Sequence, residues 1–402
     1  MSEFKAAGFS DEFGNAGPDI VGITTMTSPY YFVPPSGSTA ERPSDAPPGM
    51  LRFNTDIGRL EVWRNDHWAT ILGESPRLGD HNAGSGESRG GTGTRGMVAG
   101  GYDSSNTIDD IEYITISTLG NGVKFGDLTL GLRRDMASAS SSTRAVFAGG
   151  GNVDGSAGQT ANIEFATFAS TGNTTDFGAD LTVAKRNFGS SSNSTRALFA
   201  GGYTSSPTNT DFASIDYITM ASTGVAAQDF GDLHREQKDS NSVSSSVRAL
   251  FAGGGTVPGG SQTNAIDYVT ISSLGNGQDF GDLISGSATM GVTPVGNSTR
   301  GIFAGALLSS TLSNVIQFVT ITSTGDSQDF GDLIETRMNG GGCSSSTRGV
   351  IYSGSASGGG DRRGIEYITI STTGNGIDFG DTFTSGGLGL LGNGCSNGHG
   401  GL

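Results

Sequence analysis

The chain has 402 residues and a formal net charge of −16, and 68 residues are glycine while only 15% are charged. A chain this acidic repels polyanions, so nucleic acid is excluded as a partner. No apolar run approaches the roughly 18 residues of a membrane-spanning helix, and no charged-then-apolar leader follows Met1, so we expect neither membrane insertion nor a cleaved signal.

Residues 1–48 precede the repetitive part of the chain and indicate an extended docking arm. Six prolines cluster from Pro29 to Pro48, and an isolated segment of this composition does not fold by itself. Its apolar side chains belong to no repeat, so we expect them to become ordered on a neighbouring protein by adding to a sheet or groove. A flexible leader is the alternative. The predicted docking residues are Ile20, Val21, Ile23, Met26, Tyr30, Tyr31 and Phe32.

Residues 49–73 predict a three-stranded meander. The segments LRFNT and RLEVW flank the turn Asp56-Ile57-Gly58, and a second short turn at Asn65-Asp66 leads into HWATIL. The Gly-rich segment 84–96 follows and takes the place of a first strand in the repeats that begin there.

A unit of about 50 residues then recurs six times over residues 84–385, and its arginine, its middle aromatic and its last phenylalanine each step by 48 to 53 residues. Each unit predicts four short strands: a small-residue segment, R-x-x-F-A-G-G, an alternating apolar run such as IEYITI, and FGDL. Units of this size cannot bury their apolar faces alone and must stack. Four-stranded units at this period predict an all-β fold of β-propeller blades.

The chain ends on a seventh first-strand-like segment, residues 388–402, which has no successor. We expect this strand to close a seven-bladed ring by completing a blade whose outer strands are the meander, so that residues 49–402 form one propeller. Closure removes both open sheet edges. The alternative is a six-bladed ring with a separate N-terminal hairpin module.

The two cysteines, Cys343 and Cys395, occupy the same repeat position. We expect two buried thiols on inner strands of adjacent blades rather than a disulfide. With only four histidines in the chain, no metal site can be built around them, and we expect neither a metal nor another cofactor.

The order of these motifs resembles the kelch repeat, which is matched by glycine pairs such as Gly149-Gly150 and acid–aromatic pairs such as Glu112-Tyr113. The units depart from it at their ends, where Phe-Gly stands in place of a kelch tryptophan. Residues 41–68 resemble a module of bacteriophage tail-fibre and virion proteins, and the opening MSEFKAAGF with PDIVGITTM is similar to structural proteins of contractile-tailed cyanophages. The resemblance implies a virion structural protein, an appendage, fibre or surface-decoration component assembled in the host cytoplasm with other virion proteins, in several copies.

Side chains that recur in every unit are expected to be structural, because a group needed once for chemistry has no reason to recur. We expect each repeat arginine to pair with a carboxylate within or between blades, and the acids of the middle strands to act in the same way. The repeat residues are Arg95, Arg144, Arg196, Arg248, Arg300 and Arg348, with Asp127, Asp232, Asp282, Asp332 and Asp381 after Phe-Gly.

Two connections vary between copies, one after Gly-Gly and one after FGD-Leu, and in an up-and-down blade both emerge on the same face. A rigid ring with one variable face is typical of scaffolds that display recognition loops. The side chains best suited to bind a host surface glycan or protein there are Tyr102, Arg133, Arg134, Tyr203, His234 and Arg235. No catalytic constellation is recognisable, so we expect a binding protein and not an enzyme. The alternatives are a glycan-active enzyme on the same scaffold and a kelch-type interaction adaptor.

Overall fold

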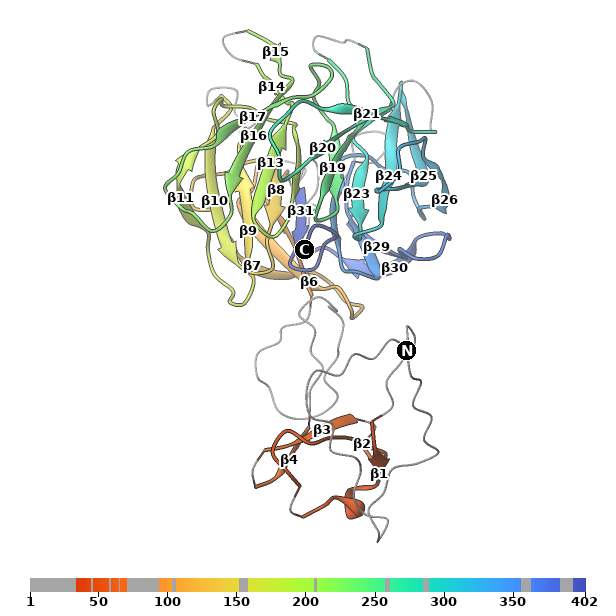
Figure 1. Ribbon diagram of the computed structural model, residues 1–402. Helices are drawn as coiled ribbons and strands as arrows, with labels where there is room; N and C mark the ends of the chain where they lie inside the picture. Colours follow the sequence, from red (N-terminus) through yellow and green to blue (C-terminus); the bar gives the residue numbers. More distant parts are fainter. Residues whose placement is uncertain are drawn as a thin grey trace, which may run out of the picture. The chain divides into compact units, whose positions relative to one another are not determined.

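The computed structural model describes residues 34–70 and 94–402, except 45, 58, 65, 103–105, 152–157, 206–207, 257–260, 285–288, 356–362 and 384–392. The predicted docking residues of the arm and the segment 84–93 lie outside this part. The described chain is all-β apart from a 3-10 turn, η1 (Thr39–Glu41). It divides into two compact units, Met1–Glu74 and Ser75–Leu402 (Figure 1).

The first unit is a small four-stranded sheet in the order β1 (Ser36–Gly37), β2 (Leu51–Asn54), β3 (Arg59–Trp63) and β4 (Trp68–Thr70). Strands β2, β3 and β4 form the antiparallel meander at the residues expected for it, and β1 adds to β2 in parallel.

The interior of this first unit is polar. Glu61 is fully buried, forms an ion pair with Arg42 and accepts a hydrogen bond of 3.1 Å from Asn54. The opposite side of the hairpin exposes Leu51 and Leu60. The buried face of this sheet therefore combines an ion pair with the buried ring of Trp63, which packs against Trp68.

The described residues of the second unit form six large antiparallel sheets, five of four strands and one of five (Figure 1). From the axis outwards each sheet consists of an inner, a second, a third and an outer strand. The inner strands are β31 (Asn393–Ser396), β8 (Ala137–Ser140), β12 (Gly189–Ser192), β18 (Asn241–Ser244), β23 (Thr293–Gly296) and β27 (Gly341–Ser344). The second strands are β5 (Arg95–Ala99), β9 (Arg144–Ala148), β13 (Arg196–Ala200), β19 (Arg248–Ala252), β24 (Arg300–Leu308) and β28 (Arg348–Tyr352).

The third strands are β6 (Asp110–Thr115), β10 (Asn162–Thr167), β16 (Ser214–Thr219), β20 (Ala265–Thr270), β25 (Thr311–Thr320) and β29 (Gly364–Thr369). The outer strands are β7 (Val123–Asp127), β11 (Thr175–Asp180), β17 (Gln228–Asp232), β21 (Gln278–Asp282), β26 (Gln328–Asp332) and β30 (Ile377–Asp381). Two short additions occur: β14 (Tyr203–Thr204) pairs with β15 (Thr210–Asp211), and β22 (Thr289–Met290) pairs with β24.

The ring closes through its inner strands, because β8, β12, β18, β23, β27 and β31 each contact the next and β31 contacts β8 again. The axis is crowded. A Cβ added at Gly342 would lie 1.9 Å from the Pro294 carbonyl oxygen, and one at Gly394 would lie 2.5 Å from the Gly342 oxygen. This crowding explains why the inner strands consist of small residues such as ASAS, GSSS and GGCS.

The expected seventh sheet is not formed by the described residues. Strand β31 pairs with β5, so that Cys395 stands opposite Met97, and the meander remains in its own sheet in the other unit. The strand pairing follows the alternative of a six-sheet ring with a separate N-terminal module. The physical reason is that β5 presents an open inner edge, which accepts a small-residue strand, whereas the meander is built of long side chains.

Apolar side chains fill the spaces between adjacent sheets. In one such cluster Leu198, Phe230 and Leu233 of one sheet pack with Phe251 and Ile271 of the next. Full burial of each such side chain stabilises the fold by about 1.5–3 kcal/mol, so every sheet depends on its two neighbours.

Each repeat arginine also links two sheets, but not through a carboxylate. Its guanidinium carbon lies 4.3–4.9 Å above the ring centre of the aromatic residue in its own third strand. Its Nη1 donates to a backbone carbonyl of the next sheet at 2.6–3.1 Å. The bond from Arg348 to the Ile116 carbonyl joins the last sheet to the first. The predicted pairing with carboxylates is wrong, because carbonyl oxygens at the end of the neighbouring third strand lie within reach.

The repeat aspartates stand at the outer rim of the ring. The backbone N–H of each donates at 3.0–3.1 Å to the side-chain oxygen of an asparagine or aspartate in the next sheet's turn. The bond between Asp381 and Asn121 again joins the last sheet to the first.

Candidate functional site

The loops that lead from each outer strand into the next inner strand meet around the ring axis. Two positions before the inner strand, each described loop has an aspartate, asparagine or glycine with φ between 55° and 67°. Only glycine, and less readily Asn and Asp, adopts this left-handed conformation without much strain. We call this set the axial ring: Asp135, Asn187, Asp239, Gly291 and Asn339.

Backbone hydrogen bonds connect the axial ring from sheet to sheet. The N–H of each member from Asn187 onwards donates to the carbonyl of the preceding member, at 2.7–3.3 Å. The sixth position falls within residues 384–392, outside the described residues. These bonds fix the mouth of the channel that the inner strands enclose, on the face where the variable connections emerge.

The residue before each axial-ring member breaks the repetition. It is Arg134, Arg186 and Lys238 in three successive sheets but Met290 and Met338 in the next two. The cations therefore occupy one arc of the mouth, where they meet two acids. Arg134 Nε and Arg186 Nη1 lie 3.7 and 3.5 Å from Asp135 Oδ2, and Lys238 Nζ lies 3.5 Å from Asp239 Oδ2. We call these five residues the axial charge cluster.

Two tyrosines of the connections after Gly-Gly contact the cations of this cluster. The Arg186 guanidinium carbon and the Lys238 Nζ each lie 4.8 Å from the ring centre of Tyr203, and Arg134 lies 5.6 Å from that of Tyr102. Cation–π contacts of this kind stabilise a cation by about 0.5–1 kcal/mol where it is exposed and more where it is desolvated. They hold the cationic side chains over the mouth.

The cluster is electrostatically unbalanced. Burial raises the pKa of Asp135 to about 7, although Arg134 and Arg186 lower it. Burial also raises the pKa of Asp239, against the effect of Lys238. The cluster also holds three cations against two acids, so positive charge is in excess there.

Hydrogen-bonding capacity also remains unused at the mouth. Among the described residues, Arg134 Nε, Arg186 Nε and Asp135 Oδ1 are buried without a hydrogen-bond partner. An unpaired buried polar group costs about 1–3 kcal/mol. Two donors and one acceptor of the cluster therefore lack a hydrogen-bond partner within the described part of the protein.

The structure brings together only some of the residues predicted to face a ligand. Tyr102, Arg134 and Tyr203 lie at the mouth. His234 and Arg235 are exposed on the same connection as Lys238, where the His234 N–H donates to Asp267 at 3.0 Å and Arg235 donates to Thr263 at 2.7 Å.

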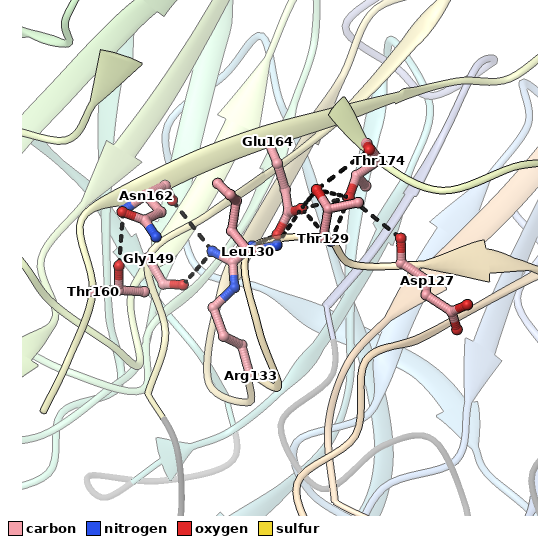
Figure 2. A network of polar contacts seen from close by, with 9 residues as sticks. All are labelled: Asp127, Thr129, Leu130, Arg133, Gly149, Thr160, Asn162, Glu164 and Thr174. Atoms are coloured by element: carbon pink, nitrogen blue, oxygen red, sulfur yellow. Dashed lines mark hydrogen bonds and ion pairs between the residues drawn. The ribbon is translucent and has the colours of Figure 1, made fainter. Parts of the chain in front are cut away.

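Arg133 does not face a ligand. Its side chain is buried, forms an ion pair with Glu164 and donates to the Gly149 and Asn162 carbonyls at 3.1 and 3.3 Å (Figure 2). Its neighbour Arg134 instead contacts Asp135 and the ring of Tyr102, because adjacent side chains of an extended segment face opposite ways. The prediction for Arg133 was wrong for that reason.

Sequence reasoning missed Asp135, Arg186, Lys238 and Asp239. The signal that could have found them is the residue tolerant of positive φ that recurs before each small-residue strand, preceded by a cation in only three copies. The recurring residues therefore identify the structural part of the ring, and the cations that occur in only three copies identify the candidate site.

The acids of the third strands join neighbouring sheets. Glu164 accepts hydrogen bonds from the backbone N–H groups of Thr129 and Leu130, at 2.9 and 3.3 Å, in the loop that follows the preceding sheet (Figure 2). Corresponding backbone N–H bonds of 2.8–3.0 Å reach Glu112, Asp267, Gln317 and Glu366. These groups hold the loops that form the mouth.

The channel behind the mouth encloses a cavity of about 70 Å³ lined by the inner strands, which is small beside ligand pockets of roughly 300–1,000 Å³. Its serine hydroxyls donate to carbonyl oxygens of the neighbouring inner strand, as Ser192 does to Ser140 and Ser244 to Ser192, both at 2.8 Å. At the opposite end His399 Nε2 lies 2.9 Å from the Ser140 carbonyl oxygen and Nδ1 accepts from the Gly401 N–H at 3.1 Å.

The two cysteines are free and buried on the adjacent inner strands β27 and β31, as predicted. Burial raises the pKa of Cys395 to about 12 and raises that of Cys343 well above its ordinary value. Both thiols are therefore protonated at neutral pH and serve as small apolar groups in the channel wall.

One acidic cluster lies elsewhere, at the edge of the first ring sheet. Carboxylate oxygens of Asp109, Asp110 and Asp127 lie within 4.8 Å of one another. The Lys124 ammonium group contacts both Asp110 and Asp127. A lysine therefore already supplies the positive charge that balances this cluster.

Over the described residues, no helix has the length and apolar character needed to cross a membrane.

Comparisons with known proteins leave the family open. No family model and no curated protein matches the chain. Among solved structures, that of YjhT is similar with a TM-score of 0.55 at 12% sequence identity, and the similarity covers 68% of this chain and 94% of the YjhT chain. At this identity the likeness concerns the fold alone.

Proposed function

We propose that the protein acts by binding and not by catalysis, as a kelch-like six-bladed propeller that presents its variable face to a ligand on a host cell surface. The observation that carries the proposal is the contrast between two classes of residue. The arginines, third-strand acids and rim aspartates recur around the ring and hold sheets together, whereas the axial charge cluster breaks the recurrence in three sheets on the variable face. Residues that differ from the other copies at a repeat position are not needed to hold the sheets together, so we assign them a function at that one site.

The ring is a suitable support for binding loops because contacts between neighbouring sheets continue around the whole circle. Inner strands, arginine bonds and third-strand acids each continue from the last sheet to the first. A rigid support reduces the entropy that binding loops lose when they order around a ligand.

The virion part of this proposal rests on the N-terminal residues. Residues 41–68 resemble the phage tail-fibre module, and they belong to the first unit, Met1–Glu74. We propose that this unit and the arm with Ile20, Tyr30 and Phe32 attach the protein to the particle as an appendage, fibre or decoration component in contact with other virion proteins.

The test combines location with binding. Cryo-electron microscopy of purified particles is expected to place the first unit against other virion proteins and the ring outwards. The full chain, fluorescently labelled, is expected to bind host cells saturably and to compete with the particle for them. Absence of the chain from particles refutes the virion assignment, and absence of cell binding refutes the display function.

A further inference from the structure

The axial charge cluster is built for a particular ligand chemistry. Its cationic side chains are mostly buried yet reachable, since Arg134, Arg186 and Lys238 keep 23%, 17% and 20% of their side-chain surface exposed. They come from three different sheets, so no single loop movement removes them. This differs from scattered surface cations, which project freely into solvent.

The balance of charge favours an anion. Three cations face two carboxylates in a chain whose net charge is −16, so the cluster is a local positive region on an acidic protein. In the next two sheets of the ring the corresponding positions hold Met290 and Met338, so the positive region ends there. Guanidinium groups present planar donors that match carboxylate and phosphate oxygens.

The unused hydrogen-bonding groups specify the rest of the ligand. Arg134 Nε and Arg186 Nε are donors that an oxyanion can satisfy, whereas Asp135 Oδ1 is an acceptor that only a donor can satisfy. A simple inorganic anion at neutral pH offers few donors. A sugar that carries an acidic group offers both, because its hydroxyls donate while its oxyanion accepts.

We propose that the axial charge cluster binds an acidic sugar of a surface polysaccharide, with its carboxylate or phosphate on Arg134, Arg186 and Lys238 and a neighbouring hydroxyl on Asp135. This inference rests on the proposed display function and names its ligand. His234 and Arg235, on the same connection as Lys238, do not hold the charge of the bound sugar.

Isothermal titration calorimetry of the full chain with glucuronate, glucose 6-phosphate, glucose and inorganic phosphate tests the inference. We expect one or both acidic sugars to bind and glucose not to bind. The substitutions Arg186→Gln and Lys238→Gln are each expected to weaken binding about tenfold or more, since a hydrogen bond to a charged group is worth about 1.5–3 kcal/mol and 1.4 kcal/mol is a factor of ten.

The matched control is Arg235→Gln, which removes the same charge from the same connection as Lys238 but outside the cluster, and we expect its affinity to stay within about twofold of the original. Met338→Lys places a cation at the corresponding position of another sheet and is expected to strengthen binding, which keeps the test valid if Arg186→Gln or Lys238→Gln unfolds the ring. Equal binding of glucose, equal loss on Arg235→Gln, or binding of inorganic phosphate as tight as that of glucose 6-phosphate overturns the inference. So does the absence of binding by either acidic sugar.

Host-cell binding by the same variants separates this inference from the proposed function. If the original chain binds cells and Arg186→Gln and Lys238→Gln bind equally well, the display function stands and the acidic-sugar inference fails. If the original chain binds no cells but binds acidic sugars through these residues, the display function fails and the ligand assignment stands.

Discussion

Removal of the cation from the buried pair Arg337–Glu366 is expected to destabilise the ring strongly. Both side chains are nearly inaccessible, with 1% and 3% of their surface exposed. Arg337 also donates to the Ser353 and Gly364 carbonyls, both at 3.0 Å. In Arg337→Met the glutamate loses its counter-charge while its bond from the Ile334 N–H remains. Removing one partner of a buried ion pair costs about 3–5 kcal/mol.

The chain itself suggests the rescue. At the corresponding third-strand position of another sheet, Gln317 takes the place of the acid and accepts a backbone bond of 2.9 Å from Ile284. The double variant Arg337→Met/Glu366→Gln is therefore expected to recover most of the lost stability, because a neutral amide needs no counter-charge.

The pH dependence provides the sharpest check. Burial already raises the pKa of Glu366, and Arg337 lowers it, so loss of Arg337 raises the folded-state pKa further above the unfolded value. An acid whose folded pKa is raised binds more protons when folded, so stability is highest below the unfolded pKa and falls as pH rises through the folded pKa. Urea unfolding should therefore show a larger loss for Arg337→Met at pH 8 than at pH 5, and a nearly constant loss for the double variant. Equal losses at both pH values for the single variant would refute the reasoning.

Three further outcomes follow from the contacts of the ring. Arg248→Gln removes the stack on Tyr268 and the bond to the Ile321 carbonyl, so urea unfolding should show a loss of about 2 kcal/mol that the exposed control Arg64→Gln does not show. Burial lowers the pKa of His399 despite the hydrogen bond to Ser140, so neutral His399 contributes to stability above the unfolded pKa of about 6.5, and this contribution falls as pH drops below it. The melting temperature of the original chain should therefore fall more between pH 7.5 and pH 5 than that of His399→Gln. Equal slopes for the two proteins would contradict this. Deletion of residues 393–402 opens the inner edge of β5, so amide hydrogen exchange of Met97 and Ala99 should lose protection while that of the first unit stays unchanged.

Much of the fold could be predicted because it is local and repeated. The alternation in segments such as IEYITI, the Gly-Gly after each second strand and the small residues of the inner strands mark strands directly. These signals depend on neighbours a few residues away, and six copies reinforce them. The buried cysteines followed in the same way from their shared place in the repeat.

The C-terminal strand was expected to close the ring, but its partner strand and the number of sheets could not be predicted, because these contacts join residues far apart in the chain. Arg95 donates its backbone N–H to Asn397, 302 positions away, and the choice of β31 for the open edge of β5 depends on how many sheets complete the circle. That number is set by the packing between sheets and not by any local pattern. The sequence identified the repeat arginines as structural residues, but it could not identify their acceptors, because these are backbone carbonyls of the next sheet.

The candidate site shows the same division. The sequence by itself determined the strands, the repeat and the face on which the connections vary, because each of these is a local or periodic property. Only the tertiary structure decided that Arg134, Arg186 and Lys238 gather with Asp135 and Asp239 at the axis, because residues about 50 positions apart become neighbours only when successive sheets turn about a common centre.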